Sequence, residues 1–181
     1  IANKEYKNVY GFEGGKIYPG FRYLFPIVVN NEHLGSVEYS VSFEAIESLM
    51  KKTFNGGDFI LHLDKSISHD KVFQWNKKYF IQSQFSSDHF LESSTLSPIT
   101  QNVIQNKIIK KINKKIIYPK SFDLLFNAHK SFATTVIIDS KGYIVTFSSL
   151  KDIANNHAAY LVSYLQNDKL IELKDKYFYF Y

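Results

Sequence analysis

A single arginine stands among the basic residues of this chain and is its clearest candidate for specific chemistry. Arg22 is the one arginine among 22 lysine and arginine residues. A guanidinium group can hold a carboxylate through two parallel hydrogen bonds, which a lysine ammonium group cannot reproduce. Two interpretations follow. Arg22 binds the carboxylate of a ligand, or it forms an ion pair with Glu38 across a hairpin, or with Glu13.

Four tyrosines and two aspartates are further candidates for ligand contacts. A tyrosine ring combines an apolar face with a polar hydroxyl, which suits a partly wet cavity, although partial core burial is an equally simple role. An aspartate can bind an amine or cap a turn, and the sequence Ser-Lys-Gly after Asp139 favours a turn there. Together with Arg22, the predicted ligand-binding residues are Tyr23, Glu38, Tyr39, Tyr143, Asp152 and Tyr160.

The remaining reactive residue types do not form a catalytic or metal-binding pattern. The six histidines are scattered, without a pair four residues apart on a predicted helix, and the chain has no cysteine. His129 and His157 lie near the ends of predicted strands, where an imidazole could sense pH, although a solvated histidine is the simpler interpretation. A Gly-x-Ser-x-Gly elbow and a phosphate-binding loop are both absent. We therefore expect no enzyme, no cofactor and no metal.

The net charge of +5 comes from one segment. Six lysines and no acidic residue lie between Lys107 and Lys120, and the rest of the chain is close to neutral. Such a segment is typical of a solvated helix face and less often contacts phosphate or lipid. We therefore expect no nucleic-acid partner. The chain also lacks a signal peptide and a run of 18 apolar residues, so by itself it is expected not to cross a membrane.

The N-terminal candidates are positioned by a predicted hairpin. Residues 1–20 are polar and rich in glycine, which indicates loop and turn. Aromatic and β-branched residues predict strands over 21–29 and 34–42, joined by a turn at 30–33. Pro26 lacks a backbone N–H, so the first strand is expected to lie at an edge or to carry a bulge there.

The rest of the chain predicts a mixture of helices and short strands. A helix over 43–54 has Ser42 as its N-cap, with an apolar stripe of Ala45, Ile46, Leu49 and Met50. Strands are expected at 58–63, 78–84, 132–138, 143–149 and 158–164, and helices at 86–96, 97–117 and 167–181. Residues 122–130 are expected to form a short helix or a loop. The aromatic end of the last helix, 177–181, either packs on the domain or lies at a membrane interface.

Two segments resemble a known family of sensors. The first is Gly11-Phe-Glu-Gly-Gly-Lys-Ile-Tyr-Pro-Gly-Phe-Arg-Tyr-Leu-Phe-Pro-Ile27, followed by Leu34-Gly-Ser-Val-Glu-Tyr-Ser40, and the second is residues 143–164. They resemble the double-Cache extracytoplasmic regions of bacterial transmembrane receptors. In those receptors, such regions precede histidine-kinase, diguanylate-cyclase or chemotaxis output modules.

The resemblance implies an α+β, PAS/Cache-like fold in which helices flank an antiparallel sheet. Residues 1–57 would be the C-terminal part of a membrane-distal module, and residues 58–181 a membrane-proximal module with an exit helix toward the membrane. One sheet containing all the strands is the alternative. The family usually has a further stretch before Gly11 that this chain lacks, so the distal module is expected to be incomplete.

The resemblance also implies a function. The chain would be the periplasmic, extracytoplasmic part of an inner-membrane signalling receptor that binds a small molecule, tethered to the membrane in the full-length protein and able to form a homodimer. If Arg22 is the anchor, the ligand is expected to be a carboxylate or an amino acid. The alternative is a protein-interaction domain without a small-molecule pocket, in which the aromatic tail and the lysine-rich face are contact surfaces.

Overall fold

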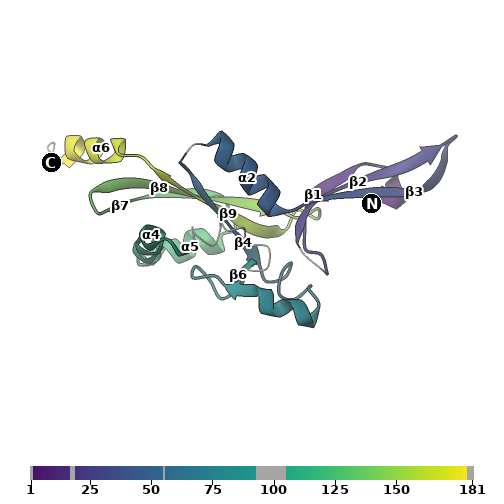
Figure 1. Cartoon of the computed structure of the whole chain (residues 1–181), viewed down its shortest axis with the longest axis horizontal. Helices are drawn as coiled ribbons and strands as arrows, with labels where there is room; N and C mark the ends of the chain where they lie inside the picture. Colours follow the sequence, from purple (N-terminus) through teal and green to yellow (C-terminus); the bar gives the residue numbers. More distant parts are fainter. Residues whose placement is uncertain (1, 17–18, 55, 93–104, 179–181) are drawn as a thin grey trace.

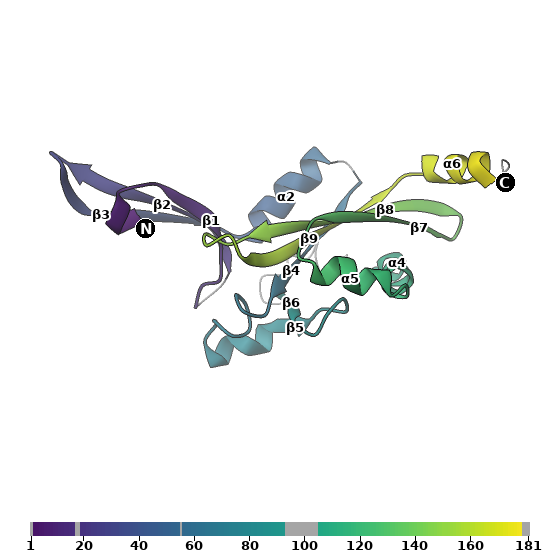
Figure 2. The same ribbon diagram turned by 180° about the vertical axis from the view of Figure 1, so that it is seen from behind.

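The computed structural model describes residues 2–16, 19–54, 56–92 and 105–178. The molecule is elongated: a three-stranded sheet projects from one end of a six-stranded body, and the C-terminal helix α6 (Lys169–Phe178) lies at the other end (Figures 1 and 2). The predicted helix start at Ser97 and Pro98, and the last three residues of the aromatic tail, lie outside the described residues.

The body is built on one antiparallel sheet with the strand order β5-β6-β4-β9-β8-β7. β4 and β9, which are the first and the last of these strands along the chain, therefore lie side by side at the centre of the sheet. This arrangement confirms the predicted α+β, PAS/Cache-like fold. The strands are β4 (Asp58–Asp64), β5 (Phe80–Gln82), β6 (His89–Glu92), β7 (Phe132–Ile138), β8 (Lys141–Lys151) and β9 (His157–Gln166).

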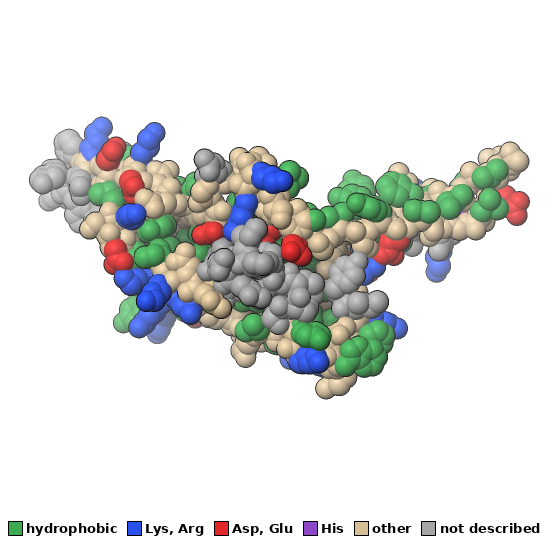
Figure 3. Space-filling view, viewed as in Figure 1, with side chains coloured by type: hydrophobic (Ala, Val, Ile, Leu, Met, Phe, Trp, Pro, Cys, Tyr) green, Lys and Arg blue, Asp and Glu red, His purple; other side chains and the backbone are tan. Residues whose placement is uncertain are grey.

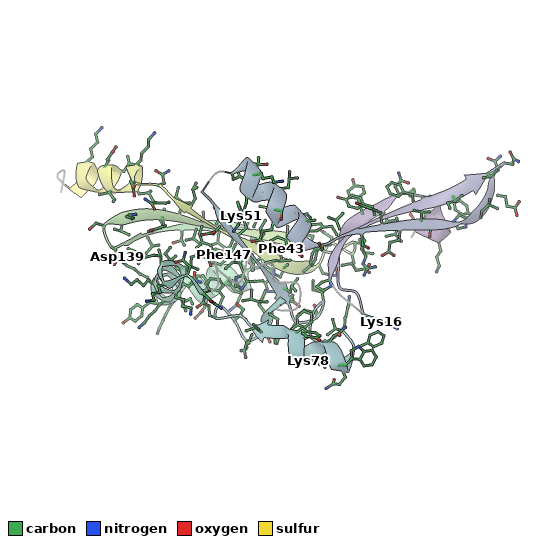
Figure 4. All side chains as sticks on the ribbon, viewed as in Figure 1. Lys16, Phe43, Lys51, Lys78, Asp139 and Phe147 are labelled. Carbon is green, nitrogen blue, oxygen red and sulfur yellow. The ribbon has the colours of Figure 1, made fainter. Side chains whose placement is uncertain are left out.

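Helices α4 (Lys107–Ile117) and α5 (Ser121–Asn127) cover one face of this sheet, below it in Figure 1. On α4, Ile109, Ile112 and Ile116 are buried, as their spacing of three and four residues predicts, while the lysines are exposed. An aromatic core lies between these two helices and the sheet. It contains Phe147, which is labelled in Figure 4. Its central rings are Phe85, Phe122, Phe126, Phe147 and Tyr160.

Helix α2 (Phe43–Thr53) lies on the opposite face (Figures 1 and 2). Its N-cap is Ser42, as predicted, because the Ser42 hydroxyl accepts a hydrogen bond from the amide N–H of Ala45. The predicted apolar stripe is only half right. Ile46 and Met50 are partly buried, whereas Ala45 and Leu49 are exposed; the helix is turned so that Glu47 is its buried residue.

The projecting sheet has the order β1-β2-β3 and carries helix α1 (Ala2–Glu5) beside it. Its strands are β1 (Val9–Glu13), β2 (Gly20–Val29) and β3 (Glu32–Val41). The hairpin turn is tighter than predicted: Asn30 and Asn31, both at positive φ, make a two-residue turn. At Pro26, β2 pairs with β3 alone, and its register shifts between Ile27 and Val28, so the proline lies at a local edge beside a bulge.

Two predicted elements are wrong. Residues 9–13, predicted as loop, form strand β1; Gly11 serves packing there, because a Cβ atom would lie 2.8 Å from Ile153 Cγ2. Residues 89–92, predicted within a helix, form strand β6, which is held between β4 and β5 by backbone pairing. The segment before β5 is a 3-10 helix, η1 (Gln74–Tyr79).

The two sheets divide at α2, next to the predicted module boundary at residue 57. One sheet containing all strands is therefore excluded for the described residues. Whether residues 1–57 and 58–181 belong to two sensor modules stays a prediction.

Candidate functional site

The predicted ligand-binding residues do not converge on one site. Arg22 forms an ion pair with Glu38, and its Nε lies 3.8 Å from Glu13 Oε2. In the β2–β3 ladder Arg22 faces Ser40, so Glu38 is its diagonal neighbour. This is the second of the two interpretations for Arg22. Its ladder partner Gly11 packs against Ile153 of the body, so Arg22 lies at the inner end of the projecting sheet.

Tyr23 and Tyr39 are direct cross-strand partners on the same sheet and are exposed. Tyr143 is buried in β8, near the turn that joins it to β7. Asp152 caps a turn by accepting hydrogen bonds from the amide N–H groups of Ala154 and Asn156. Burial alone would raise the pKa of Asp152, but the hydrogen bonds from Asn156 and Ala154 and the charge of Lys71 lower it overall.

Tyr160 is the one predicted residue at the centre of the body. Its ring is fully buried, and its hydroxyl donates to the carbonyl oxygens of Phe126, at 2.8 Å, and Lys130, at 3.2 Å. Burial raises the pKa of Tyr160 to about 12. The ladders place His62 of β4 and Ser149 of β8 on either side of Tyr160. A polar row therefore crosses three central strands of an otherwise aromatic core.

Three further histidines extend this row into a cluster. His89 Nε2 and His157 Nε2 lie 3.3 Å apart, and His157 Nδ1 lies 2.9 Å from Ser149 Oγ. The ring of His129 stacks on that of His157 with 4.4 Å between centroids. His62 Nδ1 lies 2.8 Å from Ser83 Oγ, which also accepts the amide N–H of Phe85. We call these seven residues the imidazole cluster: His62, Ser83, His89, His129, Ser149, His157 and Tyr160.

Burial keeps the inner imidazoles neutral. It lowers the pKa of His62 to about 3, with a further contribution from His89, and lowers the pKa values of His89 and His157 to about 4. For His89 the carboxylates of Asp64 and Asp88 oppose the shift without reversing it. These three imidazoles are therefore uncharged polar groups within the aromatic core.

Sequence reasoning singled out Tyr160, His129 and His157 but missed the other four residues of this cluster. His62 carried a usable signal, because it interrupts the otherwise apolar run Phe59–Leu63 that predicts a strand buried on both faces. His89 and Ser83 carried none, since they reach the cluster only through the pairing of β5, β6 and β4.

A groove of about 470 Å³ opens beside the aromatic core, between α4–α5 and the edge strand β7. Phe122 and Phe132 form its apolar floor and also pack against Phe147 of the core, with ring centroids 5.6 and 4.5 Å from that ring. Lys115 lies at the groove, with its Nζ 3.0 Å from the carbonyl oxygen of Ile137. The other polar lining residues are Ser121, Thr134 and Thr135, and Leu170 of α6 also lines the groove.

Within the described ranges, no group of three or more histidine, aspartate or glutamate side chains has the geometry of a metal site. No helix among the same residues is long and apolar enough to cross a membrane.

Comparisons with known proteins give little further information. No protein-family model and no curated protein matches the chain. A similar solved structure is the extracellular domain of a protein designated as a histidine kinase, vpHK1S-Z8, at 21% identity and a TM-score of 0.34. The match covers 92% of this chain and 51% of that one, so the chain spans about half its length. A TM-score this low carries no argument about function, which is therefore reasoned from the chain itself.

Proposed function

We propose that this chain is the extracytoplasmic ligand-sensing part of a bacterial transmembrane signalling receptor. Its ligand would be a small molecule bound in the groove between α4–α5 and β7. The proposal is carried by one observation: the groove has the volume of a small-molecule site and is lined both by the sheet and by Leu170 of the C-terminal helix. A ligand there would touch the element that leads out of the domain.

The base of α6 is fastened to the sheet, which supports this coupling. The Asn167 amide N–H donates to the Gly142 carbonyl oxygen at 2.8 Å, and the Gly142 amide N–H donates to Asp168 Oδ1 at 3.3 Å. A Cβ atom at Gly142 would lie 2.5 Å from the Asn167 carbonyl oxygen. A ligand that favours one position of Leu170 would therefore bias α6 relative to the β7–β8 turn, and the signal would pass to a cytoplasmic output module.

The lining favours a ligand with an apolar body and an anionic end. Phe122, Phe132 and Leu125 offer apolar contact, while Lys115 and the hydroxyls of Ser121 and Thr134 would bind a carboxylate. Lys115 thereby takes the anchoring role that the sequence suggested for Arg22, whose charge is already paired with Glu38.

The test is thermal unfolding of the chain against a library of organic acids, amino acids and amines. A ligand at one hundred times its Kd stabilises the folded state by ~2.7 kcal/mol. We expect hits among apolar carboxylates. The variant Lys115→Ala should weaken the hit at least about tenfold, the effect of ~1.4 kcal/mol, whereas Lys110→Ala on the same helix should leave it unchanged. A library without any hit would reject the proposed binding function.

A different observation favours a protein-interaction domain as the second candidate. One face of the projecting sheet leaves large apolar side chains exposed, visible as a green row in Figure 3; they are Tyr10, Tyr23, Phe25, Ile27, Val37 and Tyr39. Monomeric proteins rarely expose such a continuous patch. Under this function the library gives no hit, and the chain forms a homodimer in sedimentation measurements that Val37→Ser with Tyr39→Ser disrupts.

A further inference from the structure

The hydrogen bonds of Ser149 fix the position of one proton in the imidazole cluster. Ser149 Oγ lies 2.8 Å from the His129 carbonyl oxygen, which can only accept, so the hydroxyl must donate to it. The same Oγ lies 2.9 Å from His157 Nδ1. Since the hydroxyl hydrogen is already engaged, Nδ1 of His157 must carry a hydrogen and donate it to Ser149.

The tautomer of His89 follows from that of His157. A neutral imidazole has one N–H, so His157 Nε2 is a bare acceptor. His89 Nε2, 3.3 Å away, must then carry the hydrogen that lies between the two rings. This leaves His89 Nδ1 without a hydrogen. That atom is buried and has no hydrogen-bond partner among the described residues. The pair therefore forms a directional chain: His89 donates to His157, His157 to Ser149, and Ser149 to a carbonyl oxygen.

The closed pair of imidazoles can take up one additional proton, which leaves one N–H group unpaired, but it cannot take up two. The first proton turns His157 into an imidazolium that donates through Nε2, which requires His89 to move its own hydrogen to the unpartnered Nδ1. A second proton would direct two N–H groups at each other across 3.3 Å. Because neither arrangement keeps every buried donor paired, charging the pair favours separation of the two rings.

The groups around the pair oppose its protonation on balance. Asp64 of β4 and Asp88, in the residue before β6, favour the charged form of His89, and Asp64 also favours that of His157. His129, which follows α5, opposes both charges, Lys151 of β8 opposes the charge on His157, and His62 of β4 is coupled to His89. Tyr160 of β9 lies 4.5 Å from the His157 ring and stays neutral. Burial is the largest influence and favours the neutral pair.

The contact joins two strands that are not neighbours. His89 is the first residue of β6, and His157 is the first residue of β9, with β4 lying between these strands. From His157, β9 runs past Tyr160 to Gln166, directly before the base of α6. Separation of the rings would therefore remove the side-chain contact between β6 and the start of β9, which stays paired with β8 and whose other end leads to α6.

We propose that His89 and His157 form a one-proton switch: the pair is closed and neutral near pH 7, takes up a single proton in acid, and then frees the start of β9 from β6. As a proton site it stands on the geometry alone. The role of this switch in signalling rests on the proposed sensor function. In that function, acidification would be a second stimulus beside the groove ligand.

The first test needs no variant. Long-range ¹H–¹⁵N spectra distinguish the two imidazole tautomers. At pH 7.5 we expect His157 with its hydrogen on Nδ1 and His89 with its hydrogen on Nε2. On acidification the two rings should respond together, with a midpoint near pH 4 that corresponds to one bound proton. A hydrogen on His157 Nε2 at pH 7.5, or two separate titrations near pH 6.5, would overturn the proposal.

Two variants sharpen the test. Ser149→Ala removes the acceptor of the His157 Nδ1–H, so the Nε2–H tautomer of His157 should become populated. His89→Gln should raise the titration midpoint of His157, because His157 then no longer shares the added proton with a second imidazole. His69→Gln, at a histidine beside Asp70 outside the cluster, is the matched control and should change neither result. An unchanged His157 in both cluster variants would also overturn the switch. The thermal-unfolding test of the groove ligand, carried out at pH 7.5, where the pair is neutral, has an outcome independent of these spectra.

Discussion

The six-stranded body and the projecting sheet each have an apolar sheet face, which the body buries and the projecting sheet leaves largely exposed. The body covers one face with α4 and α5 and buries Phe147, Val145 and Val162 completely. The projecting sheet has a comparable apolar face, but only its inner end, at Phe12 and Phe21, packs against the body. Its outer end is exposed, so the stability of the folded chain must come mainly from the body.

The two regions also differ in how they treat charge. The aromatic core of the body contains imidazoles that burial keeps neutral, and the buried carboxylate of Glu47, on the opposite face, lies 3.8 Å from the ammonium group of Lys51. The projecting sheet keeps its ion pair between Arg22 and Glu38 partly exposed to solvent, with 19% of the Arg22 side chain and 42% of the Glu38 side chain accessible. This difference predicts which substitutions and which pH changes will matter, and four measurements test it, from the largest expected effect to the smallest.

The largest effect should come from truncating a core ring. Phe147→Ala leaves a cavity among Phe85, Phe122 and Phe132 and should lower the free energy of unfolding by about 3–5 kcal/mol. Phe25→Ala, on the exposed face of the projecting sheet, should cost less than about 1 kcal/mol. Urea unfolding measures both. Equal costs would mean that the projecting sheet is covered in solution.

Acid should destabilise the body next. The folded-state pKa values of His62, His89 and His157 lie below the ordinary 6.5, so the unfolded chain binds more protons as pH falls through 6.5 toward 4. The free energy of unfolding should therefore fall with pH in this window, by roughly 1 kcal/mol per histidine over the first pH unit.

A double variant, His89→Phe with His157→Phe, should flatten this pH dependence, and His33→Gln in the projecting sheet should not. Chemical denaturation at pH 7.5, 6.5 and 5.5 is the measurement. Stability that rises on acidification would contradict the buried, neutral state of the cluster.

A smaller loss is expected from deleting one buried hydroxyl. Tyr160→Phe removes the donor shared by the carbonyl oxygens of Phe126 and Lys130 and should cost about 1–2 kcal/mol. Tyr39→Phe, whose hydroxyl belongs to an exposed ring of the projecting sheet, should be close to neutral. Thermal unfolding of the two variants is the measurement. If Tyr160→Phe does not lower the stability, water must replace the hydroxyl.

The smallest effect should come from the ion pair of the projecting sheet. A double-mutant cycle of Arg22→Ala and Glu38→Ala should give a coupling energy below about 1 kcal/mol, because the Glu38 side chain is 42% exposed. Arg22→Ala should also leave groove-ligand affinity unchanged. A coupling above about 2 kcal/mol, or a lost ligand, would restore Arg22 as a functional residue.

The sequence was most informative where a signal is local. Ser42, the Asn30–Asn31 hairpin and the isoleucines of α4 each predict their own structure, because capping, turn and periodicity act over a few residues. β6 was misjudged as helix because only its pairing with β4 and β5 makes it a strand. The imidazole cluster was mostly missed for the same reason, since it gathers residues from strands and loops far apart in the sequence.

The central position of β9 restricts how this protein can move. β9 is paired along one edge with β4 and along the other with β8. A slip by one residue would turn Tyr160, Val162 and Tyr164 from the aromatic core to the opposite face, and a slip by two would displace the strand by about 6.6 Å. β9 can therefore slide only by whole two-residue steps, each of which breaks its backbone pairing with β4 and β8. Under the proposed sensor function, a graded displacement of α6 would therefore come from a tilt of the sheet against α4 and α5 rather than from sliding of β9.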